Sequence, residues 1–274
     1  MIAKRIAPTL NYLLLIVLAL VVLYPLLFTV SSSFMTEKEV SNFPPPLFPS
    51  QLYLENFKNA ISGFPIVRFI LNSFIVSSGI TVSQVITSSL AAYAFSFLNF
   101  KGKKVLFAIF LSTMMIPWEV TIIPNYLTIK NWGWMDSYQG LIVPFMAGAF
   151  GVFLLRQFFL QLPNELFDAA KIDGCGHLRN FYSIVLPLSR PALSTLAVYV
   201  FLTHWNHYLW PLLITNRASM RTVQIGVSML QHAEVMSWNL ILAGVTIVLL
   251  PSFLLLALGV KQLVRGITAG AVKG

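Results

Sequence analysis

The chain contains 274 residues, of which 57% are hydrophobic and only 10% carry a charge. Its mean hydropathy of +0.78 is too high for an ordinary soluble domain. The formal net charge is +9, but basic residues interleaved with aromatic ones, as in proteins that stack on bases, are absent outside the apolar runs. The composition therefore predicts a membrane protein with no nucleic-acid partner, whose positive charge contacts anionic membrane lipids.

Six apolar runs are long enough to cross a hydrocarbon core, which takes about 20 helical residues. The third run is interrupted at Pro117, Glu119 and Pro124, and the fourth at Gly148 and Gly151. Such breaks leave backbone groups without their helical hydrogen bonds, and neighbouring helices can supply partners for these groups. We therefore predict an all-α membrane protein with six transmembrane helices in a single transmembrane domain, residues 1–274. The predicted spans cover residues 10–33, 69–97, 105–127, 138–160, 191–214 and 239–260.

Lysine and arginine set the predicted orientation. With both termini in the cytoplasm, 12 of the 18 basic residues fall on the cytoplasmic side, as the positive-inside rule requires. The first run is too long for a cleaved signal peptide, so we expect it to remain as the first helix. The longest external segment, Phe34–Arg68, contains Pro44–Pro46, which predicts an extended strap. Cys175 is the single cysteine, so no disulfide can form within the chain.

The polar loop between the fourth and fifth runs, residues 161–190, is expected to hold a short helix. Pro163 is predicted at its first position and Glu165 in its first turn, facing the positive end of the helix dipole. Gly174 and Gly176 tolerate positive φ and are expected to end it. A second amphipathic run follows, until Pro187 stops it. The faces are predicted from spacing as Leu166, Ala169, Ala170 and Asp173 in the first helix, and Leu178, Phe181, Tyr182 and Val185 in the second.

The same loop carries a spaced motif. It reads Asp168-Ala169-Ala170, three residues, Gly174, nine residues and then Ile184-Val185-Leu186-Pro187. This motif resembles the EAA loop of permease subunits of binding-protein-dependent ABC importers, with Asp168 in place of the usual Glu. Residues 202–212 and 266–274 are similar to segments of carbohydrate-uptake permeases of the maltose type and the glycerol-3-phosphate type.

The resemblance implies a non-enzymatic subunit that imports a carbohydrate or a sugar-phosphate such as glycerol-3-phosphate. Its implied partners are a second homologous permease subunit, two copies of a cytoplasmic ATPase subunit and an extracytoplasmic solute-binding protein. The chain lacks a phosphate-binding G-x-x-x-x-G-K-[ST] loop and an H-E-x-x-H metal motif, so we expect no cofactor or metal on it, and ATP and magnesium on the ATPases. The coupling helix that docks on an ATPase would comprise Asp168, Ala169, Ala170, Asp173, Gly174, Ile184, Leu186 and Pro187.

Polar residues within the spans are candidates for a solute pathway, because each is costly in hydrocarbon. On straight helices, Glu119 of the third span and His204 of the fifth lie at nearly the same depth, next to aromatic rings that suit sugar faces. Alternatively, the acid reaches the outer interface and the aromatics form an interfacial belt. The candidates are Glu119, Asn125, His204, Trp205, Asn206, His207 and Tyr208.

Two alternatives stay open from sequence. One helix face of the second span carries Ser73, Ser77, Thr81, Gln84 and Ser88, which either line an aqueous path or pack against neighbouring helices, with packing favoured. The chain could also be an ion-coupled secondary transporter or channel, although such proteins usually show internal repeats, which we do not detect. The terminal segment 266–274 is expected to reach the ATPase pair.

Overall fold

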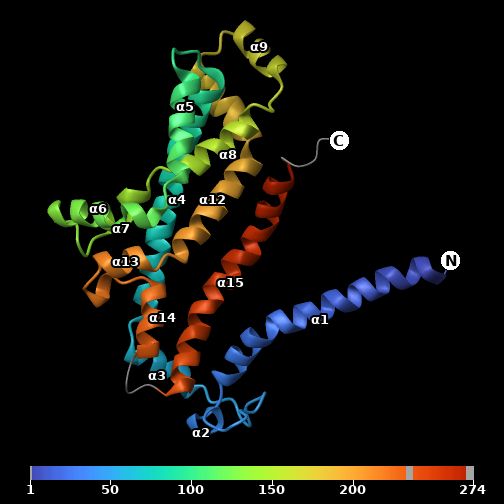
Figure 1. Cartoon of the computed structure of the whole chain (residues 1–274), viewed down its shortest axis with the longest axis vertical. Helices are drawn as coiled ribbons and strands as arrows, with labels where there is room; N and C mark the ends of the chain where they lie inside the picture. Colours follow the sequence, from blue (N-terminus) through green and yellow to red (C-terminus); the bar gives the residue numbers. More distant parts are fainter. Residues whose placement is uncertain (1, 233–236, 270–274) are drawn as a thin grey trace. The chain divides into compact units, whose positions relative to one another are not determined.

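The computed structural model describes residues 2–232 and 237–269, and within them every regular element is helical (Figure 1). The chain divides into two compact units. Unit 1 comprises Met1–Val67 and Gly226–Pro251, and unit 2 comprises Arg68–Ile225 and Ser252–Gly274. The polar loop of residues 161–190, called the coupling loop below, and the predicted pathway residues all belong to unit 2.

Unit 1 begins with α1 (Ile2–Ser32), whose segment Asn11–Ser32 has a hydropathy of 2.9 and is long enough to cross a membrane. The segment that follows, predicted to be external, differs from the predicted strap, because it folds into α2 (Glu37–Val40) and α3 (Glu55–Gly63) around the proline run. Thr36 and Glu39 form a capping box at the start of α2, and Glu39 also accepts a hydrogen bond from the Ser50 amide at 3.0 Å. The prolines therefore connect two helices.

A buried amide joins the parts of unit 1 that are distant in sequence. Asn56 of α3 donates to the carbonyls of Ser33 and Met35 at 2.9 and 2.8 Å. Its own carbonyl oxygen accepts a 2.8 Å hydrogen bond from Asn239 of α15 (Trp238–Ala269). Both side-chain amides are buried, so these hydrogen bonds replace the ones that the amides would otherwise make with water.

Unit 2 is built on α4 (Ile66–Phe97), a single helix of 32 residues that covers the predicted second span. The third span is not one helix, in contrast to the prediction. It consists of α5 (Lys103–Ser112) with the 3₁₀ turn η1 (Thr113–Met115), followed by α6 (Trp118–Asn131) after a bend of 94°. Pro117 lies at this bend, where it has no amide hydrogen to continue the helix.

The fourth and fifth spans are also broken. The fourth contains α7 (Tyr138–Ile142), η2 (Val143–Phe145) and, after a 45° bend, α8 (Ala149–Phe159). The fifth, predicted as one helix over 191–214, ends at Trp205 as α12 (Arg190–Trp205) and resumes as α13 (Leu209–Ile214). The chain continues through η4 (Ala218–Met220) and α14 (Val223–His232) to α15, which contains the sixth predicted span. Of the predicted tail, residues 270–274 lie outside the described residues.

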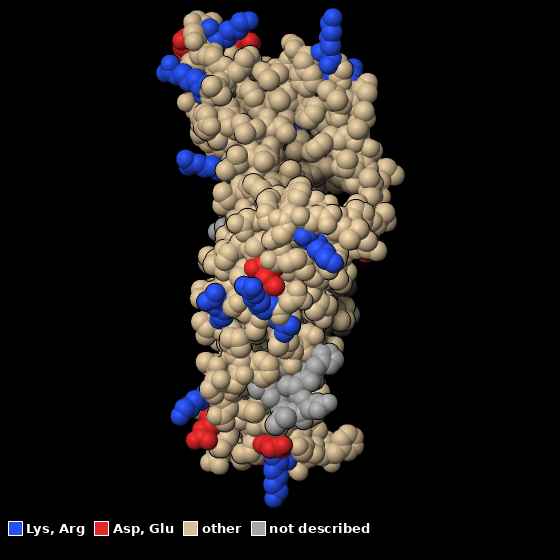
Figure 2. All heavy atoms as spheres, turned by 90° about the vertical axis from the view of Figure 1, so that its left-hand side faces the viewer, with Lys and Arg blue, Asp and Glu red and all other residues tan. Residues whose placement is uncertain are grey.

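Within the described residues, two helices alone are long and apolar enough to cross a membrane, and up to five crossings result if each bent pair is one span. In unit 2, Figure 2 shows mostly uncharged surface between the basic groups at the α9 end and those near α6 and α13. An apolar zone between two charged ends is typical of a protein that crosses a membrane.

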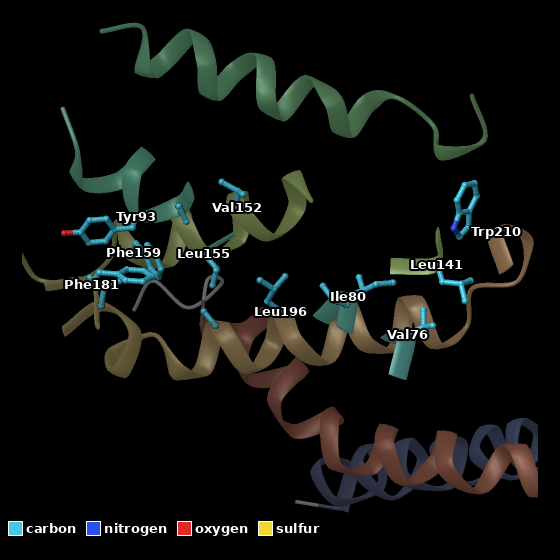
Figure 3. Close-up of a cluster of buried hydrophobic side chains, with 14 of the residues drawn as sticks. Val76, Ile80, Tyr93, Leu141, Val152, Leu155, Phe159, Phe181, Leu196 and Trp210 are labelled. Atoms are coloured by element: carbon cyan, nitrogen blue, oxygen red, sulfur yellow. The ribbon is translucent and has the colours of Figure 1, made fainter. Parts of the chain in front are cut away.

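The polar face of α4 packs against neighbouring helices, as the favoured alternative predicts. Gln84 donates a 2.8 Å hydrogen bond to the Phe145 carbonyl, and Ser73 accepts one of 2.9 Å from the Val223 amide. A Cβ on Gly151 of α8 would lie 2.4 Å from Oγ of Ser88, so the two helices touch through their small residues. The larger core side chains, among them Ile80, Leu155 and Leu196, fill the space between α4, α8 and α12 (Figure 3).

Candidate functional site

The predicted loop helix is confirmed as α9 (Asn164–Ile172). We expected Pro163 to be the first helical residue, but it is the N-cap residue of α9. At this position too, its missing amide hydrogen costs no helical hydrogen bond. Glu165 lies in the first turn, where its carboxylate favours the positive end of the dipole. In Figure 1, α9 lies at one end of unit 2, close to the turn between α4 and α5.

The C-terminal end of α9 forms a complete Schellman motif. The Cys175 amide donates to the Ala170 carbonyl at 2.8 Å, and the Gly174 amide donates to the Lys171 carbonyl at 3.1 Å. Gly174 has φ of +73°, the left-handed conformation that this motif requires of its glycine. Gly176 does not share the role we predicted for it, because its φ is −77°.

Helix α9 has one face packed against the rest of unit 2 and one face exposed. Ala170 is buried, and Phe167 packs against Phe97 of α4 with ring centroids 4.5 Å apart. Asp168, Ala169 and Asp173 of the predicted docking face are exposed, and beside them Ile172 is 87% exposed. An apolar side chain of that exposure next to small residues is a surface suited to a partner protein.

The second half of the loop forms α10 (His177–Asn180), the π-helical turn η3 (Phe181–Val185) and α11 (Leu186–Leu188) without interruption. Pro187 does not stop this run as predicted, because the helix continues past it from the π turn to Leu188 and ends at Ser189. The predicted common face is also wrong: Phe181 and Val185 are buried, whereas Leu178 and Tyr182 are 73% and 63% exposed. The extra residue of a π turn rotates the helix faces that follow it.

The motif residues Ile184 and Leu186 are half-buried on this second helix, and Pro187 is exposed. Helix His177–Leu188 meets α12 at an angle of 76°. Asp168 to Gly174 and Ile184 to Pro187 therefore occupy different helices of one loop, joined by the turn at Gly174–Gly176.

Five of the seven predicted pathway residues, numbers 204–208, lie where the fifth span is broken. His204 is in the last turn of α12 and His207 lies in the break, with ring centroids 5.7 Å apart. The Phe145 ring lies 4.9 Å from His204 and 5.1 Å from His207, and Trp118 lies 5.8 Å from His207. We call these four side chains the histidine–aromatic cluster. Nδ1 of His204 and Nε1 of Trp118 are buried without a hydrogen-bond partner in the part of the chain that the structure describes.

The other predicted pathway residues have different surroundings. Asn206, the C-cap residue of α12, is exposed and accepts a 3.2 Å hydrogen bond from Gln224. Trp205 points elsewhere: it is 1% exposed, and its N–H donates to Ser252 at 2.9 Å. Tyr208 is 39% exposed at the start of α13.

The depth argument for Glu119 fails because the third span does not run straight. Glu119 and Asn125 both lie on α6, beyond the 94° bend, and Glu119 is exposed while Asn125 is half-buried. The residue that reaches the histidines from this helix is the neighbouring Trp118. Sequence reasoning missed Trp118, Phe145 and Gln224, and the only available signal was that Trp118 directly follows the predicted break at Pro117.

Within residues 2–232 and 237–269, no group of three or more His, Cys, Asp or Glu side chains could hold a metal ion. The candidate site has two parts: the exposed face of α9, which is the candidate docking face, and the histidine–aromatic cluster at the helix breaks.

Comparison with known proteins assigns this arrangement to a family. Residues 84–268 match the family described as binding-protein-dependent transport system inner membrane component. The chain belongs to this family. The matched region includes both the coupling loop and the histidine–aromatic cluster, and membership sets aside the alternative of an ion-coupled secondary transporter or channel.

Several curated relatives are similar over almost the whole chain. The sn-glycerol-3-phosphate transport system permease protein UgpE of Brucella melitensis is 36% identical, covering 96% of this chain and 97% of its own length. The UgpE proteins of Rhizobium meliloti and Yersinia pestis are 35% and 37% identical, covering 97% and 93% of this chain and 98% and 94% of their own lengths. The chain is thus a permease component of the inner membrane.

A solved structure supports the fold. A chain of a bacterial ABC transporter involved in the import of the acidic polysaccharide alginate superimposes with a TM-score of 0.83. The two chains are 21% identical, and the match covers 94% of this chain and 97% of the other. At that identity the likeness establishes a shared helical permease fold.

Proposed function

We propose that this chain is the permease subunit of an ATP-driven importer that carries sn-glycerol-3-phosphate, or a closely related sugar or sugar-phosphate, into the cytoplasm. The observation that carries the proposal is α9, a short helix with an exposed docking face and a Schellman cap at Gly174, placed between two spans of a member of this family. The solute assignment rests on the relatives of 35–37% identity, which are sn-glycerol-3-phosphate permeases by name.

The proposed topology has six crossings with both termini in the cytoplasm. α1, α4 and α15 supply three, and the bent segments 103–131, 138–159 and 190–214 supply the others. Broken helices are tolerated at membrane depth where the freed backbone groups face protein or a water-filled path.

The proposed assembly contains a second, homologous permease subunit, two copies of a cytoplasmic ATPase subunit and an extracytoplasmic solute-binding protein. ATP and magnesium would bind the ATPases, since this sequence has no phosphate-binding loop of the G-x-x-x-x-G-K-[ST] type. Residues 161–190 would dock on one ATPase, with Asp168, Ala169, Asp173 and the exposed Ile172 in the contact.

The proposed transport step begins when the ATPase dimer closes and displaces α9. Because only Ser189 separates helix His177–Leu188 from α12, which it meets at 76°, the displacement would be passed to α12 and so to the break at Asn206. The solute would pass the histidine–aromatic cluster, where imidazole and indole N–H groups can donate to phosphate or hydroxyl oxygens and aromatic faces can cover the carbon skeleton.

Uptake in a deletion strain tests the proposal. Cells that lack this subunit should lose uptake of radiolabelled sn-glycerol-3-phosphate and regain it when the subunit is restored, and the restored subunit should co-purify with an ATPase. Maltose uptake should be measured in parallel, because its loss in the deletion strain would indicate that the solute is a neutral sugar. Absence of a co-purifying ATPase, with uptake unchanged, would overturn the proposal.

A further inference from the structure

Two aromatic side chains at the end of α4 hold both halves of the coupling loop. Phe97 packs on Phe167 of α9, with ring centroids 4.5 Å apart. One helical turn earlier, Tyr93 packs on Phe181 of η3 with centroids 5.3 Å apart, and its hydroxyl lies 3.3 Å from Nδ1 of His177. The Tyr93 and Phe97 rings are themselves 5.1 Å apart.

The centre of this contact set is enclosed. Tyr93 and Phe181 are 7% and 4% exposed, and Phe159, which stacks on Phe97 at 6.3 Å, is fully buried. Phe97 and Phe167 are themselves half-buried. Figure 3 shows Tyr93, Phe159 and Phe181 gathered at one end of the hydrophobic core. Closely packed interiors transmit displacement because their side chains have little free volume in which to yield. A movement of α9 or of α10 therefore reaches α4 directly, without passing through α12.

The opposite end of α4 is held just as firmly. Asn72 is buried and donates hydrogen bonds to the carbonyls of Ser219 and Arg221 at 2.9 and 2.8 Å, while it accepts one from the Tyr138 hydroxyl at 2.8 Å. The next residue, Ser73, accepts from the Val223 amide at 2.9 Å. This segment leads straight to Gln224, which donates to Asn206 in the break of the fifth span.

Between its two ends α4 is a single uninterrupted helix of 32 residues. From Asn72 to Phe97 it spans about 37 Å, at 1.5 Å per residue. Of the other segments, the helices in 103–131 and in 138–159 are bent by 94° and 45°, and the loop helix His177–Leu188 meets α12 at 76°. α4 is thus an unbroken element that connects the coupling loop with the segment next to the pathway.

We propose that α4 is the rigid rod that transmits movement of the coupling loop to segment 219–224, with Phe97 and Tyr93 as positioning residues at one end and Asn72 and Ser73 at the other. This inference rests on the proposed docking of residues 161–190 on an ATPase, and it adds a second route, besides α12, by which that docking reaches the solute pathway. A rigid element with defined contacts at both ends is one physical arrangement that can couple distant sites energetically.

Paired substitutions in the complete importer, reconstituted in vesicles, test the inference. Phe97→Leu removes the ring contact with α9, and Phe95→Leu is its control, since Phe95 lies on the same helix but packs on Phe107 of α5. The measured quantity is solute transported per ATP hydrolysed. We expect Phe97→Leu to lower this ratio about two- to tenfold, the range that an aromatic pair represents, and Phe95→Leu to leave it unchanged.

The other end has its own matched pair. Ser73→Ala removes the acceptor for the Val223 amide, whereas Oγ of Ser77, one turn further along, is buried without a partner among the described residues. Ser73→Ala should lower the solute-to-ATP ratio, and Ser77→Ala should not.

A cross-link decides between transmission and a merely structural role. With Cys175→Ser as background, Phe97→Cys and Phe167→Cys together replace the ring contact by two thiols. A short thiol-reactive cross-linker should restore the solute-to-ATP ratio that the double substitution lowers, because α4 and α9 then move again as one body. Loss of transport on cross-linking would overturn the inference, as would equal ratios for Phe97→Leu and Phe95→Leu. Failure of the proposed function is distinguishable, because the unsubstituted complex would then show no coupled uptake.

Discussion

Gly174 and Gly176 lie two positions apart in the coupling loop, and only one of them needs to be glycine. Gly174 has φ of +73°, which costs an ordinary L-residue roughly 1–2 kcal/mol, whereas Gly176 has φ of −77°. A Cβ on either residue would have no heavy atom within 4 Å, so within this chain the two sites differ in backbone conformation and not in available space.

Gly174→Asp should therefore reduce solute-stimulated ATP hydrolysis of the assembled importer by about two- to tenfold while membrane insertion stays normal, because aspartate adopts positive φ more readily than most residues but less readily than glycine. The added strain opens the Schellman cap and shifts the end of the docking helix. Gly176→Asp introduces the same charge without strain and should retain most activity. Equal losses in the two variants would mean that charge, and not conformation, decides.

Asn206 gives a test of the solute pathway. Asn206→Leu should lower transport several-fold with little change in the yield of assembled complex, because an exposed amide in the helix break is lost. Its hydrogen-bond partner Gln224 supplies the comparison. If the pair only joins helices, Asn206→Leu and Gln224→Leu should reduce assembly alike, and a fall in yield for both would contradict a role in the pathway.

In unit 1, the ionisation of Glu39 should make the stability of the loop 36–50 depend on pH. A hydrogen bond from the Ser50 hydroxyl, followed by bonds from the Thr36 and Ser50 amides, lowers the pKa of Glu39 from 4.5 to about 2. Because the folded-state pKa is the lower one, the ionised carboxylate stabilises the loop fully above pH 4.5, and this contribution is lost as the pH falls towards 2.

Hydrogen exchange of residues 36–50, compared between the wild type and Glu39→Gln at each pH, measures this effect. The variant should exchange faster at neutral pH, and the difference should shrink below pH 4.5. A difference that persists unchanged to pH 2 would show that the carboxylate charge does not hold the loop.

Among the helices, the contact of α8 with α4 depends on the absence of a side chain at Gly151. A Cβ there would lie 2.4 Å from Oγ of Ser88 and 3.2 Å from Leu196. Gly151→Ala should therefore destabilise unit 2 by about 1–3 kcal/mol, as overpacking of a close contact does, and lower the thermal stability of the purified complex. Ser88→Ala should partly restore it, because the hydroxyl that clashes has no hydrogen-bond partner in the described residues. An additive loss in the double variant would contradict the close approach.

For the whole molecule, the proposed orientation can be read from Cys175, the single cysteine, in the coupling loop. A membrane-impermeant maleimide should label it in inverted membrane vesicles and leave it unlabelled in intact spheroplasts. In the Cys175→Ser background, a cysteine at the exposed Lys130 should show the reverse pattern. Labelling of Cys175 from outside would invert the topology and remove the coupling loop from the cytoplasm.

The sequence by itself determined the features that depend on neighbouring residues. The helix Asn164–Ile172 and its end at Gly174 follow from local capping and backbone preferences, and the spaced motif around them indicates the family without any tertiary contact. The positions of the apolar runs could also be predicted from sequence, because hydropathy averaged over about 20 residues does not depend on how the chain bends.

Only the tertiary structure decided where the pathway residues meet. Hydropathy carries no direction, so it could not show the 94° turn of α6 relative to α5, after which Trp118 and not Glu119 contacts His207. Nor could spacing show that Phe97 faces Phe167 while Phe95 faces Phe107, since both rings lie in one apolar run. Such contacts join residues far apart in sequence, and the identity of a partner across a helix interface is set by packing and not by local pattern.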